Sequence, residues 1–124
     1  MSAAAHSPRA RFQSYRLDGA LLFFQPSSGA NIRVQNERTR SFTRGAPRAV
    51  MFGITNRCNL HCTFCSRDVT RPSDWTVESA AEMIQGLARA GSLEVAFGGG
   101  EPCAFRGIAE LIAELHRSTR LALN

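Results

Sequence analysis

Three cysteines lie within eight residues of one another, and this group constrains the chain more than any other feature of its sequence. Cys58, Cys62 and Cys65 have the spacing C-x3-C-x2-C. A cubane iron–sulfur cluster is normally held by four cysteine ligands, so a loop that supplies three leaves one iron with an open position. An open position is what distinguishes a catalytic metal centre from a structural one. The spacing therefore predicts a reactive metal-binding loop.

The segments on either side of the cysteine loop alternate between strand-like and helix-like patterns. Residues 49–55 are a near-continuous apolar run, which is typical of a parallel strand covered on both faces. Apolar residues recur at helical spacing over residues 77–90, with Thr76 as a candidate N-cap and Gly91 as a stop. The same alternation continues with a strand over residues 93–97, a helix over residues 108–115 and the start of a strand over residues 121–124. This order predicts an α/β fold with parallel pairing.

A glycine-rich motif, Gly98-Gly99-Gly100-Glu101-Pro102, directly follows the second of these strands. Glycines without a Cβ let the backbone approach a ligand closely and adopt positive φ. In α/β barrels the active site lies on the loops after the carboxyl ends of the strands. We therefore expect the cysteine loop, which follows the first strand, to lie beside this turn on the same rim.

Together, the two motifs make the chain resemble the radical S-adenosylmethionine (radical SAM) superfamily. Its members carry a C-x3-C-x2-C loop with an aromatic residue before the last cysteine, as Phe64 is here, and a Gly-Gly-Glu-Pro segment, as at residues 99–102. The resemblance runs from about Ala49 to the last residue. It implies that the three cysteines hold a [4Fe-4S] cluster whose fourth iron is chelated by S-adenosylmethionine. It also implies a 5′-deoxyadenosyl radical that abstracts hydrogen from a substrate.

The resemblance further implies which residues bind S-adenosylmethionine. Glu101 is expected to help bind the methionine ammonium group, and Pro102 to stiffen the turn that Gly99 and Gly100 form. Phe64 is expected to pack near the adenine or the cluster; the alternative is ordinary core packing. No residue of the chain is assigned a catalytic role of its own.

The composition of the chain predicts three segments. Residues 1–16 are polar and arginine-containing, and are predicted to be a disordered N-terminal arm. Residues 17–48 are predicted to form a β-hairpin and a linker, because two apolar runs flank a Pro/Ser/Gly turn. Residues 49–124 are predicted to be an incomplete radical SAM core. The expected fold is a truncated (β/α) partial barrel, with about two βα units and the start of a third strand, preceded by the hairpin.

Two alternatives to an active radical SAM fragment follow from the same residues. The chain could be a catalytically inactive, truncated remnant, or it could be an iron–sulfur or zinc module that uses Cys103 as a fourth ligand. A zinc site that adds His61 to the three cysteines is awkward, because His61 adjoins Cys62. The ordinary interpretation of Cys103 is a small buried residue.

The charge of the chain bears on its partners. Residues 1–48 hold eight arginines against two carboxylates, whereas residues 49–124 hold seven against eight. Because these arginines are scattered without a binding motif, nucleic acid is not an expected partner. No apolar run approaches the roughly 20 residues of a membrane span, and no secretory signal is recognisable, so a cytoplasmic protein without membrane contact is expected. The resemblance implies a small-molecule or peptide substrate and an electron donor such as flavodoxin or ferredoxin.

Overall fold

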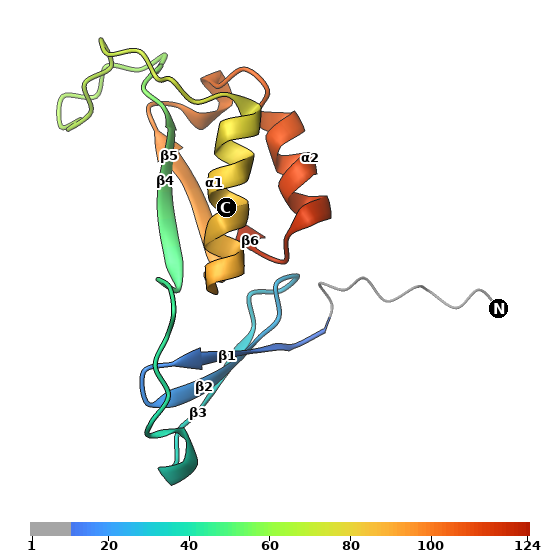
Figure 1. Ribbon diagram of the computed structural model, residues 1–124. Coiled ribbons are helices and arrows are strands. Elements are labelled where there is room, and N and C mark those ends of the chain that lie inside the picture. Colours follow the sequence, from blue (N-terminus) through green and yellow to red (C-terminus); the bar gives the residue numbers. More distant parts are fainter. Residues whose placement is uncertain (1–10) are drawn as a thin grey trace.

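The computed structural model describes residues 11–124, which form an antiparallel sheet and an α/β unit (Figure 1). The antiparallel sheet has the order β1-β2-β3, with strands β1 (Gln13–Leu17), β2 (Ala20–Phe24) and β3 (Asn31–Val34). Strands β2 and β3 confirm the predicted hairpin. Strand β1 corrects the predicted boundary of the N-terminal arm, because residues 13–16 belong to the sheet. The remainder of that prediction, over residues 1–10, lies outside the described residues.

The α/β unit begins at residue 49, as predicted. It contains β4 (Ala49–Thr55), α1 (Val77–Ala90), β5 (Glu94–Gly99), α2 (Ile108–Ser118) and β6 (Ala122–Leu123). Its strands are parallel in the order β4-β5-β6. The mixed α/β class is therefore confirmed. The three strands form a small open sheet, and a partial barrel is not established by them.

Helix α1 forms where its end signals predicted it. The hydroxyl of Thr76 accepts a hydrogen bond from the Ser79 N–H, and the Ser79 hydroxyl accepts one from the Thr76 N–H. This reciprocal cap satisfies two donors of the first turn. At the other end, Gly91 adopts φ +107°, a left-handed conformation that suits glycine.

Both helices cover the same face of the parallel sheet (Figure 1). The buried core between the sheet and the helices comes from the strands, from one stripe of each helix and from two connecting residues. Its members are Phe52, Ile54 and Val95 of the strands, Ala80, Ala81, Ile84, Leu111 and Leu115 of the helices, and the connecting Phe105 and Leu121. The other face of the sheet carries Met51, which is 79% exposed. The expectation that the first strand is covered on both faces is therefore wrong for the described residues, because α1 and α2 both lie on one side.

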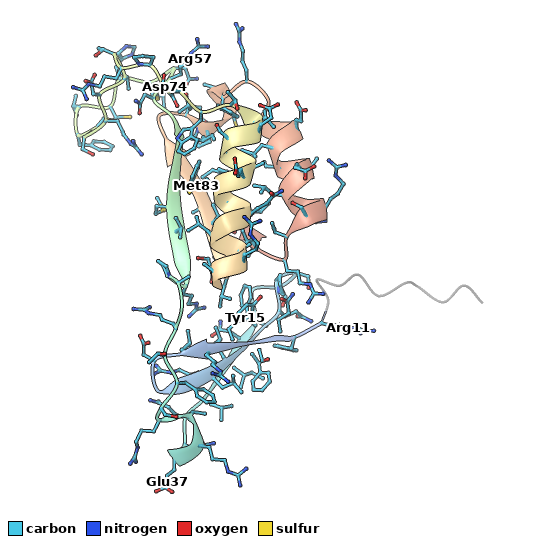
Figure 2. The ribbon with its side chains drawn as sticks, viewed as in Figure 1. Arg11, Tyr15, Glu37, Arg57, Asp74 and Met83 are labelled. Carbon is cyan, nitrogen blue, oxygen red and sulfur yellow. The ribbon has the colours of Figure 1, made fainter. Side chains whose placement is uncertain are left out.

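The antiparallel sheet packs against the amino ends of the parallel strands. Leu22 and Phe24 are buried against Leu93, which directly precedes β5, and Tyr15 packs onto this cluster. Burial raises the pKa of the Tyr15 phenol, whose hydroxyl donates a hydrogen bond to Gln13 Oε1 at 2.7 Å. Figure 2 shows Tyr15 between the two parts of the molecule. The carboxyl ends of the strands are thus left open at the opposite end.

Within residues 11–124, no helix combines the length and the apolar character that crossing a bilayer requires.

Candidate functional site

The two sequence motifs meet at the carboxyl ends of β4 and β5, as expected. Thr55, the last residue of β4, pairs with Gly99 at the end of β5. The Gly100 N–H donates a hydrogen bond to the Thr55 carbonyl oxygen at 2.7 Å, and the Glu101 N–H donates one to the Arg57 carbonyl oxygen at 2.7 Å. The glycine turn is therefore bonded to the residues that lead into the cysteine loop.

Two glycines of the turn are required by this close approach. Gly99 has φ +119°, and a Cβ added there would collide with the Thr55 carbonyl oxygen. A Cβ at Gly100 would collide with the Arg57 carbonyl oxygen. The sequence suggested that these glycines admit a ligand. The structure gives them a second reason, which is contact with the neighbouring strand end.

Glu101 caps the short 3₁₀ helix η3 (Pro102–Ala104). Its Oε1 accepts a hydrogen bond from the Cys103 N–H at 3.0 Å, and the Phe105 N–H closes the turn onto the Pro102 carbonyl oxygen at 3.0 Å. Glu101 as a whole residue is half-buried at the rim. This hydrogen bond holds the Glu101 carboxylate in place. Glu101 is the residue that the sequence analysis expects to bind the methionine ammonium group.

The cysteine loop projects beyond the end of β4 with little packing (Figure 1). Cys58 is half-buried, Cys62 and Cys65 are exposed, and none of the three forms a disulfide. Every residue from 59 to 72 is exposed. Among the described residues, no three or more Cys, His, Asp or Glu side chains gather as they would around a metal ion.

The chemistry of the loop nevertheless fits a cluster, because it offers three free thiols, two of which already accept hydrogen bonds. The Leu60 N–H donates to Cys58 Sγ at 3.4 Å, and the Arg67 N–H donates to Cys65 Sγ at 3.5 Å. Hydrogen bonds to sulfur ligands are one of the features that set the potential of an iron–sulfur cluster. The donor set is therefore suitable, although the thiols are not gathered.

Two side chains near the site lie differently from the ordinary expectation. Cys103 is exposed, so the interpretation as a small buried residue is wrong; it occupies the outer side of a single turn of 3₁₀ helix. Phe64 is 88% exposed, which contradicts core packing. An aromatic ring of this size in water loses favourable burial, so its exposure leaves it available to a bound group.

Sequence reasoning missed the residues that return the loop to the fold. The Ser73 hydroxyl donates to the Ile54 carbonyl oxygen at 3.0 Å, and the Trp75 ring packs on Phe52 with centroids 4.9 Å apart. The Arg67 guanidinium lies against Gly53, where a Cβ would collide with it. A glycine inside an apolar strand is a signal of such close approach, so this contact had a trace in the sequence.

Comparison with known proteins decides the family. The family model of the Radical SAM superfamily matches residues 52–123, more than half of the chain. The chain belongs to the radical SAM superfamily. The match includes both motifs and the elements that join them.

Individual relatives of this radical SAM chain agree. It is 35% identical over 82 residues to the PqqA peptide cyclase of Bradyrhizobium diazoefficiens, covering 64% of this chain and 22% of the relative. It is 32% identical over 75 residues to the Fe-coproporphyrin III synthase of Methanosarcina barkeri, covering 58% and 19%. It is 35% identical over 71 residues to the GTP 3′,8-cyclase of Paenarthrobacter nicotinovorans, covering 52% and 20%. The chain spans about a fifth of the length of the curated relatives it matches.

Proposed function

We propose that Cys58, Cys62 and Cys65 ligate a [4Fe-4S] cluster and that Phe64 and residues 99–102 bind S-adenosylmethionine at its open iron. The observation that best supports this proposal is the hydrogen-bonded contact between the two motifs. The Glu101 N–H donates a hydrogen bond to the carbonyl oxygen of Arg57, the residue that precedes Cys58. When bound, the cluster and S-adenosylmethionine supply a carbon-centred radical that abstracts hydrogen from a substrate. The protein supplies binding, orientation and shielding.

Each residue of the proposed site has a distinct physical task. The thiolates provide charge and soft sulfur ligands. Glu101, held by its cap on the Cys103 N–H, presents a carboxylate at a fixed place for an ammonium group. Gly99 and Gly100 keep the backbone at the rim free of side chains, and Phe64 supplies an apolar surface that covers the bound group.

The substrate class that we propose is a peptide or a small molecule, with a flavodoxin or ferredoxin as the electron donor. The relatives are named for a peptide, a coproporphyrin and GTP. Since these substrates and products differ, the shared stretch supports a common cofactor site and not one substrate. A four-thiolate site with Cys103 is the competing proposal, because Cys103 is exposed on the turn that adjoins the loop.

The test is anaerobic reconstitution with iron and sulfide, followed by low-temperature EPR of the reduced protein with and without S-adenosylmethionine. We expect a [4Fe-4S]⁺ signal that changes when S-adenosylmethionine is added. The variant Cys62→Ser should lose the cluster, whereas the matched variant Cys103→Ser should retain it together with the response. Loss of the cluster in Cys103→Ser would establish the four-thiolate site. A cluster indifferent to S-adenosylmethionine would contradict the cofactor assignment.

A further inference from the structure

The antiparallel sheet at the other end of the molecule is apolar on both of its faces. Leu22 and Phe24 of β2 point into the junction with the α/β unit. The intervening residues Leu21 and Phe23 must point the other way, because side chains alternate along a strand. We call this second side the outer face, and the strand register places six residues on it: Ser14, Arg16, Leu21, Phe23, Ile32 and Val34.

This outer face departs from what a half-buried antiparallel sheet normally shows. Such a sheet presents polar residues to water and apolar residues to the core. Here four of the six outer residues are apolar, and Ile32 on the edge strand β3 is 56% exposed. Strand β3 pairs with β2 alone among the described strands, so its second edge carries unpaired backbone groups. An apolar face that continues to an open edge is the arrangement that binds an added strand.

The charge around the sheet is strongly positive. Residues 11–48 hold seven arginines against Asp18 and Glu37. Arg44 is paired with Asp18 at 3.0 Å, and Arg48 is paired with Glu94 at 3.4 Å. Over the described residues, the other arginines of this segment form no ion pair: Arg11, Arg16, Arg33, Arg38 and Arg40. Of these, Arg16 lies over the Phe42 ring at 4.8 Å.

We propose that the outer face and the β3 edge bind an acidic peptide segment in extended conformation, with apolar residues at alternate positions. Its backbone would pair with β3, its apolar side chains would extend the surface of Phe23 and Ile32, and its carboxylates would meet the arginines. Affinity in such complexes comes from backbone hydrogen bonds and specificity from the alternate side chains. The surface is independent of the cofactor site, since the two lie at opposite ends of the parallel strands (Figure 1).

Charge complementarity selects this occupant over three others. Residues 1–10 contain no acidic side chain and so do not match an arginine-rich surface. A second copy of the chain would bring like charges together, which opposes association. Single-stranded nucleic acid would fit the charge but binds by stacking on exposed aromatic rings. Among the apolar residues of the outer face, the aliphatic Ile32 is exposed, whereas Phe23 is half-buried.

The experiment is selection of short random peptides displayed on phage against the immobilised 124-residue protein, followed by anisotropy titration of the enriched peptides. We expect enrichment of acidic peptides with alternate apolar residues. Ile32→Asp should weaken their binding about tenfold or more, as for a residue at the centre of a contact. The matched control is Met51→Asp, because Met51 is a 79% exposed apolar residue of the other sheet; its affinity should equal that of the wild type.

A second variant, Arg38→Glu with Arg40→Glu, should weaken binding and flatten its dependence on salt, with an unchanged thermal unfolding curve. The proposal is overturned if no peptide is enriched, if the enriched peptides lack acidic residues, or if Met51→Asp weakens binding as much as Ile32→Asp. It is also overturned if a single-stranded oligothymidine binds and loses affinity in Ile32→Asp. The same holds if the wild type is a dimer that Ile32→Asp converts to a monomer.

Discussion

The glycine turn after β5 and the cysteine loop after β4 begin at the same edge of one sheet, yet the protein holds them in different ways. The Gly100 N–H bonds the turn to Thr55 at the end of β4, and the Glu101 N–H bonds it to Arg57 just beyond. Gly99 and Gly100 leave no room for a Cβ. The loop is exposed from residue 59 to residue 72. The turn is therefore organised by the protein alone, whereas under the proposed function the loop would be ordered by the cluster that its thiolates hold.

The interactions inside the loop support this contrast, because each of them joins residues that are close together in the sequence. The Cys65 N–H bonds the Cys62 carbonyl oxygen at 3.1 Å. Hydrogen bonds from the Thr70 hydroxyl and N–H hold the pKa of Asp68 below its ordinary value, and Asp68 also pairs with Arg71 at 3.4 Å. Interactions between residues this close in the sequence order a single turn, but they do not fix the whole loop to the rest of the fold.

Loading the cluster should produce the largest change. In the protein without metal, trypsin should cleave the loop after Arg67, because Arg67 lies in the exposed stretch and is not followed by proline. Reconstitution should slow this cleavage about tenfold or more, since binding lowers the population of open loop conformers. Gel and mass analysis of timed digests measures it. Equal cleavage rates with and without cluster would show that the loop does not order around metal, and Cys62→Ser serves as the unprotected control.

Changing the turn should have the next largest effect. Gly99→Ala should lower the free energy of unfolding by about 2–4 kcal/mol, because it combines a disfavoured φ with a collision at the Thr55 carbonyl oxygen. Gly29→Ala is the matched control, since Gly29 has φ +72° and nothing within 4 Å of an added Cβ. It should cost only about 1 kcal/mol. Urea unfolding followed by circular dichroism compares them, and equal costs would refute the proposed contact.

Anchors at the end of the loop should have a smaller effect. Ser73→Ala removes the hydrogen bond to the Ile54 carbonyl oxygen and should cost about 1 kcal/mol. Thr70→Ala, which removes a hydroxyl bonded only within the exposed loop, should stay within about 0.5 kcal/mol of the wild type. The same urea titrations measure both. If Thr70→Ala proved the more damaging, the interior of the loop would be better fixed than its anchor.

The smallest effect on stability should come from Phe64→Ala. Phe64 is 88% exposed, so the free energy of unfolding should change by less than about 0.5 kcal/mol. In the reconstituted protein, the concentration of S-adenosylmethionine that half-saturates the EPR change should rise about three- to tenfold, because an aromatic contact is lost. An unchanged midpoint would remove Phe64 from the proposed cofactor site.

The α/β unit was readable from the sequence because its signals are local. Thr76 and Gly91 mark the ends of α1 through capping chemistry that neighbouring residues complete. By contrast, residues 13–16, which form most of β1, were predicted to belong to a disordered arm. Tyr15 and Leu17 pack against a buried cluster whose members include Leu93, a residue far away in the sequence. A short strand that is stabilised by packing against such a distant residue shows little hydrophobic periodicity of its own in the sequence.

In the candidate site as well, some features could be predicted from the sequence and others could not. The cysteine spacing and the Gly-Gly-Glu-Pro segment indicated the family, because both are patterns of residue type and spacing that the sequence shows directly. That Cys103 is exposed could not be read from its neighbours, because exposure depends on the direction in which the 3₁₀ turn after Glu101 faces.

By itself, the sequence determined the order of the strands and helices from residue 49 onward and the residue types of the proposed cofactor site, because capping, periodicity and ligand chemistry act over a few residues. Only the tertiary structure decided which strand ends meet, which face of each sheet is covered, and that Gly99 and Gly100 serve a contact between strand ends. Those outcomes depend on packing between segments about 45 residues apart, such as Thr55 and Gly99, which no local pattern encodes.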